Sequence, residues 1–320
     1  MRMGKACFTQ KPLTHSIYEA RELGKIAREM KVATQMGNQG TANDTLRRAA
    51  AVIKGGAVGP VKEVHVWTNR PIWPQGGPAP AKADPPANLH WDLWLGPAAA
   101  RDFGNGYHPF AWRGWWDFGT GALGDMACHT VNMPFMALNL RDPISVQAES
   151  SGHNKVSYPK WSVIEFAFGQ SGERAPCKMF WYDGGKKVDK DLLDGEKLSD
   201  TGVLIIGEKG KLFAPGDYCE NGHKLLGGAT DPKVEFVKSP GHFAEFARAI
   251  KGGEPAMSNF PDYSGPLSET ILLGNLAVWA APESGAKGKK IDWDAKNLKA
   301  TNAPEVESIV KTTYREGYSL

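Results

Sequence analysis

The first sixty residues alternate between short apolar runs and longer stretches with helical periodicity. The short runs, residues 5–10 and 32–36, predict strands, and each is followed by a predicted helix. In the first helix apolar or small residues recur every three or four positions from residue 17 to residue 30, with Thr14 as the expected N-cap. In the second they recur from Leu46 to Ile53, and Gly55-Gly56 ends the helix. The order strand, helix, strand, helix predicts a parallel α/β layer.

From residue 61 onward the pattern changes to many short, alternating or β-branched segments. They predict strands over 61–69, 144–151, 162–169, 177–183, 202–206, 211–214 and 233–238. Helical periodicity returns only afterwards, over residues 241–251 and 267–280. Strands and helices that are gathered separately predict an α+β domain with a large, mostly antiparallel sheet. The predicted fold is therefore an α/β piece followed by this α+β domain.

A long irregular segment follows the first strand of this second part. Six prolines lie within residues 71–86, and seven of the eleven tryptophans lie within residues 67–116. Prolines at this density exclude regular secondary structure. Two interpretations remain open: the indoles fasten a long loop to the sheet, or some of them line a cleft in which flat rings pack against sugar faces.

Composition and charge argue against a nucleic-acid-binding protein, a membrane-spanning protein and a metal site, but do not select one function. The 320 residues are 41% hydrophobic and 23% charged, with a formal net charge of +3 that is spread along the chain. Without a basic stripe, nucleic acid is not an expected partner, and without an apolar run of about 18 residues no membrane span is expected. The four cysteines form no C-x-x-C pair, and no two histidines are spaced H-x-x-x-H, so no metal site is predicted.

One segment, WDFGTGALGD (residues 116–125), is the only match to the dinucleotide fingerprint G-x-G-x-x-G. A true fingerprint follows a buried strand and opens a helix in a compact βαβ unit. Here the preceding residues, AWRGWWDF, include Arg113, Gly114 and Asp117 and do not form a buried-strand pattern. We therefore expect these glycines not to bind a nucleotide.

The residues after these glycines, GDMACHTVNMPFMAL, predict a mostly buried helix. Asp125, His129 and Asn132 stand at positions i, i+4 and i+7, so they form one polar stripe on that helix. Buried polar groups need partners or a cleft. Either the stripe is a hydrogen-bonded network that orients the helix, or it is an acid–base pair in which Asp125 raises the pKa of His129.

Lys11 poses a similar choice. It stands at a predicted strand end, and Pro12 follows it at the turn into a helix. Strand ends of α/β layers face the ligand crevice. Lys11 is then either a site residue or an ordinary exposed lysine.

Taken together, these segments resemble the glucose–fructose oxidoreductase/inositol dehydrogenase (Gfo/Idh/MocA) family. QKPLTHSIYEARELGKIAREMKVATQMGNQ resembles its E-K-P segment, and GTGALGDMACHTVN resembles its glycine-rich segment with the Asp and His of the active site. The residues from HFAEFARAIKGG to YREGYSL resemble its C-terminal portion. The resemblance covers essentially the whole chain, with separate motifs in the same order.

The resemblance implies the last part of a Rossmann domain over residues 1–37 and a substrate and oligomerisation domain over residues 38–320. It implies NAD or NADP as cofactor, a sugar, polyol or related carbohydrate-like substrate, and a homo-oligomer formed through the open face of the sheet. Lys11, Asp125 and His129 correspond to the family's catalytic residues. The expected cofactor-binding residues are Gln10, Lys11, Pro12 and Asn38. The expected substrate contacts are Asn132, by correspondence, and Arg113, His108 and Trp115, by their place in the aromatic segment.

Three departures from the family pattern qualify this expectation. Gln10 replaces the usual Glu of E-K-P, and Asn132 replaces an Asp. The phosphate-binding G-x-G-x-x-G half of a Rossmann domain does not occur in the sequence, so we expect this chain alone to bind NAD weakly or not at all. The cellular location stays open, with cytoplasmic as the default, since any export signal would belong to that missing N-terminal half.

Other functions remain open at this point. Within the family, some relatives use NAD-dependent oxidation to eliminate and so hydrolyse glycosides. From a different class, a non-catalytic carbohydrate-binding or scaffold protein would share the aromatic segment. A metal-dependent hydrolase using Asp125 and His129 is disfavoured, because no third ligand stands at a recognisable spacing.

Overall fold

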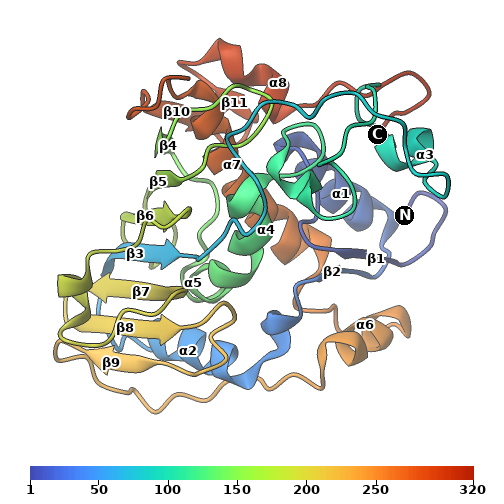
Figure 1. The fold of residues 1–320 in the computed structure, drawn as a ribbon. Coiled ribbons are helices and arrows are strands. Elements are labelled where there is room, and N and C mark those ends of the chain that lie inside the picture. Colours follow the sequence, from blue (N-terminus) through green and yellow to red (C-terminus); the bar gives the residue numbers. More distant parts are fainter.

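A computed structural model describes residues 1–320 (Figure 1). The N-terminal part is a β-α-β-α piece whose elements are β1 (Cys7–Gln10), α1 (Ile17–Met30), β2 (Thr34–Gly37) and α2 (Asp44–Lys54). Strands β1 and β2 pair in parallel, with Gln10 opposite Gly37. The carboxyl ends of both strands therefore lie side by side, and Lys11 and Asn38 follow them directly.

Helix α1 begins two residues later than the sequence pattern predicts, because Ser16 and not Thr14 caps it. The Ser16 hydroxyl accepts a hydrogen bond from the Glu19 N–H, and the Glu19 carboxylate accepts one from the Ser16 N–H at 2.9 Å. This reciprocal pair satisfies two N–H groups that a helix start otherwise leaves free. The side chain of Thr14 instead donates to the Ser16 carbonyl.

The second sheet has nine strands in the order β11-β10-β4-β5-β6-β3-β7-β8-β9. Their bounds are β3 (Val61–Trp67), β4 (Ser145–Ser150), β5 (Ser162–Phe168), β6 (Cys177–Tyr182), β7 (Gly202–Gly207), β8 (Gly210–Pro215), β9 (Lys224–Leu226), β10 (Ile291–Asp294) and β11 (Lys299–Ala300). Only β3 and β6 pair in parallel; all other neighbours are antiparallel. The predicted large, mostly antiparallel sheet after a short α/β piece is thus confirmed.

Helices gather on one side of this sheet, as Figure 1 shows. The remaining α-helices are α3 (Trp91–Leu95), α4 (Gly121–Thr130), α5 (Asn132–Leu138), α6 (His242–Ile250), α7 (Gly265–Ala280) and α8 (Glu307–Val310). Short 3-10 or π turns occupy Gln39–Ala42, Ala111–Gly114, Lys190–Leu193, Phe260–Ser264 and Pro304–Val306. None of the helices combines the length and the apolar character that a membrane span needs.

The alternation along the central strands decides which face of the sheet the helices cover. In β5, Ile164 and Phe166 are fully buried, whereas the intervening Glu165 is only half-buried. Successive side chains of a strand point to opposite faces, so this pattern buries one face and leaves the other partly open. The buried face packs against α7, and α7 in turn packs against α4, the helix that carries Asp125 and His129.

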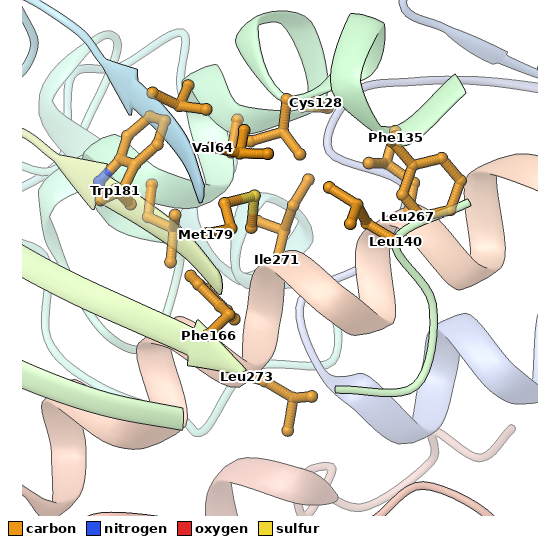
Figure 2. Close-up of a cluster of buried hydrophobic side chains, with 14 of the residues drawn as sticks. Val64, Cys128, Phe135, Leu140, Phe166, Met179, Trp181, Leu267, Ile271 and Leu273 are labelled. Carbon is orange, nitrogen blue, oxygen red and sulfur yellow. The ribbon is translucent and has the colours of Figure 1, made fainter. Parts of the chain in front are cut away.

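Figure 2 shows how tightly the two layers meet: side chains from the sheet point toward those of α4, α5 and α7. The labelled residues include Phe166, Met179 and Trp181 from the sheet, Cys128 and Phe135 from the helices beside it, and Leu267, Ile271 and Leu273 from α7. Gly274 of α7 marks the closest approach, because a Cβ there would lie 2.4 Å from Leu123 and 2.9 Å from Phe166. The interior packing thus fixes the position of α4.

The opposite face of the sheet is only half covered. The segment 183–201 crosses it, where Val188 and Leu193 pack on Trp67, Leu204 and Phe213 to form a second, small hydrophobic cluster. Beyond that cluster the face carries side chains that no helix covers. Val163, Phe180 and Tyr182 are half-buried there.

Two predictions about elements are wrong, each for a tertiary reason. Residues 233–238 form no strand, because the sheet edge beside β8 is taken by β9 and the segment lies along α2 instead. There Arg47 and Arg48 of α2 donate to the carbonyls of Val237 and Val234. The helix predicted through GDMACHTVNMPFMAL is broken into α4 and α5. Pro134 has no N–H to donate to the carbonyl four residues earlier, so the ladder of α4 ends there.

The close approach at Gly274 yields a stability prediction. Gly274→Ala should lower the free energy of unfolding by about 1–3 kcal/mol, because the added methyl collides with Leu123 and Phe166. Helix propensity alone would change stability by about 1 kcal/mol in the opposite direction. Urea denaturation measures the difference. Gly77→Ala is the matched control, since nothing lies within 4 Å of its added Cβ; equal effects at both positions would contradict the packing argument.

Candidate active site

Two parts of the fold meet where Lys11 approaches α4. Lys11 directly follows β1, and its Nζ donates to Oδ1 of Asp125 at 3.0 Å and to the Asp125 carbonyl at 2.8 Å. Arg113, from the turn before α4, donates from Nε to the same Oδ1 at 3.2 Å. The side chains of Lys11 and Asp125 are only 21% and 11% exposed. One carboxylate thus orients two cations in a partly desolvated place.

His129 lies one turn further along α4 and is buried. Its Nδ1 has no hydrogen-bond partner, and its ring meets the edge of Tyr218 at a centroid distance of 4.7 Å. Burial first, and then the positive charges of Lys11 and Arg70, lower the pKa of His129 to about 3, although Asp125 acts in the opposite direction. The imidazole is therefore neutral at physiological pH and able to accept a proton.

This arrangement corrects one part of the acid–base interpretation. We expected Asp125 to raise the pKa of His129 into the working range. Asp125 does act in that direction, but desolvation together with Lys11 and Arg70 outweighs it. The hydrogen bonds described for Asp125 come from Lys11 and Arg113 rather than from the imidazole. The Asp125 carboxylate therefore pairs with Lys11 and Arg113, not with the imidazole of His129.

The glycines of WDFGTGALGD serve packing at the entry to α4. Gly121 has φ +64°, and a Cβ there would lie 2.8 Å from the ring of Tyr158. A Cβ at Gly119 would lie 2.5 Å from the carbonyl oxygen of Arg113. These contacts let the chain fold back so that Arg113 reaches Asp125. They account for the glycines without a nucleotide.

Asn132 and Asn38 lie in the interior beside this cluster. The Asn132 amide donates to Thr41 Oγ1 at 2.8 Å, and its side-chain oxygen accepts from the Tyr263 hydroxyl. The Asn38 amide donates to the Cys128 carbonyl at 3.5 Å, and its oxygen accepts from Ser258. Both side chains are fully buried and join β2 and the following turn to the helices. Their predicted contacts with cofactor and substrate stay predictions.

The other predicted cofactor residues lie at the shared strand edge. Gln10 ends β1 with its side chain beside Gly37, where a Cβ would lie 2.5 Å from Gln10 Oε1. Lys11 and Pro12 follow at the carboxyl end of the same strand. Carboxyl ends of parallel strands are where α/β sheets bind ligands. The structure thus gathers Gln10, Lys11, Pro12 and Asn38 at one edge.

Of the substrate contacts expected in the aromatic segment, only Arg113 reaches the cluster. Trp115 is buried and donates from Nε1 to the Gly106 carbonyl at 3.0 Å, so it fastens the loop. His108 is exposed and meets Trp94 edge-on at 6.0 Å. The Arg113 guanidinium lies 4.6 Å over the ring of Trp112.

Three residues that the sequence patterns do not reveal complete the surroundings of His129. Tyr218 covers the imidazole from the loop after β8, and a Cβ at Gly40 would lie 3.2 Å from its ring. Burial raises the pKa of the adjacent Asp217, whose Oδ1 is buried without a partner. Arg70, just beyond β3, contributes positive charge. The loops lie far from α4 in sequence, so only the sheet order brings them to it.

Other polar groups near the cluster set limits on its chemistry. Burial raises the pKa of the Cys128 thiol to about 12, so this cysteine is no thiolate at physiological pH. Nowhere in residues 1–320 do three or more His, Cys, Asp or Glu side chains gather as metal ligands would.

Comparison with known families matches most of the chain. The family model described as "Oxidoreductase family, C-terminal alpha/beta domain", of the Gfo/Idh/MocA group, covers residues 66–320. No curated protein matches the chain.

Solved oxidoreductases share this fold. The aldose-aldose oxidoreductase from Caulobacter crescentus, complexed with glycerol, is 14% identical with a TM-score of 0.55, over 91% of this chain and 73% of that one. The WlbA dehydrogenase from Bordetella pertussis, in complex with NADH and UDP-GlcNAcA, is 16% identical with a TM-score of 0.55, over 88% and 70%. GenD2 from gentamicin A biosynthesis, in complex with NAD, is 17% identical with a TM-score of 0.52, over 92% and 73%. At these identities the likeness establishes the fold.

The buried, neutral state of His129 makes stability depend on pH. Its folded pKa lies below the ordinary value of 6.5, so on acidification the unfolded chain gains a proton that the folded chain does not. The neutral state of His129 therefore contributes fully to the free energy of unfolding above about pH 6.5, and this contribution is lost as the pH falls. Between about pH 7 and pH 5 the wild type should lose about 2 kcal/mol more stability than His129→Asn. Urea denaturation at both pH values measures this, and identical losses would contradict it.

Proposed function

This chain belongs to the Gfo/Idh/MocA oxidoreductase family, and we propose that it oxidises a CH–OH group of a sugar, polyol or related compound with NAD or NADP. The observation that carries the proposal is a buried, neutral His129 beside a lysine and an arginine that share one carboxylate. The relatives solved with NADH or NAD and with glycerol or a sugar nucleotide support this choice of cofactor and substrate class.

His129 accepts the proton of the reacting hydroxyl. A general base must be unprotonated at the working pH, and desolvation together with Lys11 and Arg70 keeps the imidazole in that state. Protonation of His129 places a new positive charge close to Asp125, which favours the imidazolium. Negative charge that develops on the substrate oxygen beside the ring favours the imidazolium in the same way.

Lys11 stabilises that developing charge. Its ammonium is held by two acceptors of Asp125, the carboxylate and the main-chain carbonyl, and so needs no reorganisation during the reaction. One N–H of the ammonium remains for the substrate oxygen. Arg113 shares the Asp125 carboxylate and adds a second fixed cation at the same place. Asp125 acts in this scheme as the residue that positions Lys11.

The carboxyl edge of β1 and β2 suits the nicotinamide end of the cofactor. Gly37 brings the two strand ends so close that a Cβ would touch Gln10, and Lys11 leads from this edge to Asp125. Gln10, Lys11, Pro12 and Asn38 would hold the nicotinamide. The chemistry a bound nicotinamide supplies is acceptance of hydride from the substrate carbon.

Substitution of the base and the cation tests the proposal. His129→Asn should lower kcat/KM by about 10²–10⁴-fold, since it removes general-base catalysis. Lys11→Met should lower it by about 10²–10³-fold, since it removes stabilisation of the alkoxide. The assay follows formation of NADH or NADPH with a panel of sugars and polyols at millimolar NAD or NADP, because this chain alone is expected to bind the cofactor weakly.

His153→Asn is the matched control, because His153 is equally buried and bonds the Ala281 carbonyl away from the cluster. Unchanged kcat/KM in His129→Asn would refute the role of His129 as general base. Saccharide binding without turnover of any member of the panel would favour the non-catalytic carbohydrate-binding interpretation instead.

We also propose a homo-oligomer formed through the uncovered part of the sheet. Val163, Phe180 and Tyr182 lie half-buried on that face, and the charged Glu165 stands between them. Exposed apolar groups on a sheet face favour burial against a second copy.

Replacement of Phe180 by Asp would place an uncompensated charge in this interface and should shift the chain toward the monomer, as light scattering after size-exclusion chromatography measures. Val237→Asp is the control, because that side chain is exposed and lies along α2, outside the sheet. A monomeric wild type would overturn this proposal.

A further inference from the structure

A cleft with two lobes opens between the N-terminus of α1, the aromatic segment and the C-terminal segment. The lobes have volumes of about 190 Å³ and about 180 Å³. Their walls share His15, Ala98, Asp117 and Thr312, so the two lobes lie side by side; together they are called here the two-lobed cleft. Together the lobes reach the lower end of the size range of small-molecule sites.

Aromatic rings line both lobes. Trp94, Trp112 and Phe118 line the smaller lobe, and Trp116, Tyr158 and Trp279 line the larger one. Trp94 stacks with one face on Trp91 at 4.8 Å, which holds its ring rigidly at the wall. Hydrogen-bonding groups stand among these rings; they are Asp117, Asn275, Thr312 and Thr313.

Two short chain connections lead from the walls of the cleft to the candidate active site. Trp112 in its wall precedes Arg113, whose guanidinium covers the Trp112 ring and whose Nε donates to Asp125. On the other side His15 follows Lys11 by four residues, and its Nε2 lies 2.8 Å from the Trp116 carbonyl. The wall of the cleft and the two cations of the active site are therefore held by the same turns.

The chemistry of the lining selects the occupant. Lys155 is the only lysine or arginine in either lobe, and its Nζ lies 3.3 Å from Glu283. Phosphate groups of a nucleotide would need more cations than this. The partly exposed indoles of Trp94, Trp112 and Trp279, with hydroxyl and amide groups nearby, instead match the apolar faces and equatorial hydroxyls of a sugar ring.

We propose that the two-lobed cleft is a saccharide subsite that holds a second sugar ring, linked to the ring whose CH–OH group reaches His129. The substrate is then a disaccharide or glycoside rather than a free monosaccharide. The assignment of the reacting end rests on the function proposed above, whereas the binding of a sugar in the cleft does not.

Calorimetric and tryptophan-fluorescence titration of the 320-residue chain without cofactor tests the subsite. The probes are glucose and galactose against cellobiose, maltose and lactose. At least one disaccharide should bind about tenfold more tightly than either monosaccharide, because it adds stacking in the cleft. Trp94→Ala should remove that advantage. Thr312→Trp should remove it too, since an indole at the residue shared by both lobes fills their junction.

Trp161→Ala is the matched control, because that half-buried indole packs under Lys186 and lines neither lobe. Thr312→Trp keeps the test valid if Trp94→Ala unfolds, since Thr312 is partly exposed and lies outside the core. Equal affinities for mono- and disaccharides, no binding of any probe, or unchanged binding in both cleft variants would each overturn the subsite.

The same titration separates this inference from the proposed function. In His129→Asn the preference for the disaccharide over the monosaccharides should persist, because the cleft is unchanged. Binding that depends on the cleft without any turnover would leave the subsite standing and refute the oxidoreductase chemistry. Turnover of a sugar with a KM that neither cleft variant changes would support the oxidoreductase chemistry and refute the subsite.

Discussion

The ion pair between Lys11 and Asp125 is the contact on which the candidate site depends. It joins the carboxyl end of β1 to the second turn of α4, so it ties the small parallel sheet to the helix layer of the large one. Because both groups are largely withdrawn from water, removal of either would leave a charge in a desolvated place. The ion pair therefore fixes the position of β1 relative to α4. Arg113 adds a third segment, because its bond to the same carboxylate holds the aromatic segment beside them.

From this constraint follows the state of His129. Asp125 is occupied by two cations, so the imidazole one turn away is left with burial and positive charge around it, and it stays neutral. A neutral base beside a fixed cation is suited to removal of a hydroxyl proton, whereas an imidazolium is not. Packing produces this environment: Tyr218 from the loop after β8 shields the ring, and the interior contacts of α7 fix the helix that carries it.

Much of the fold was predictable from local patterns, because alternation and helical periodicity reflect which face is buried. Six of the nine strands of the large sheet were predicted within a few residues, as β5 and β6 show, whereas the short edge strands β9, β10 and β11 were not. The failures came where the same local pattern permits two outcomes. Residues 233–238 alternate like a strand, yet Arg47 and Arg48 of α2 satisfy their carbonyls outside the sheet. The family resemblance pointed to Lys11, Asp125 and His129, but not to Tyr218, Asp217 or Arg70, whose loops carry no pattern that distinguishes them.

The sequence by itself determined the kinds of groups that meet: a lysine after a strand, an aspartate and a histidine one turn apart, and a segment rich in tryptophan. These are consequences of spacing along one element, and spacing is visible in a sequence. The tertiary structure decided which charges act on the histidine and which tryptophans face open space. The pKa of His129 and the lining of the two-lobed cleft both depend on distances between segments far apart in the chain. Electrostatic and desolvation energies depend on those distances and on burial, and only the folded chain sets them.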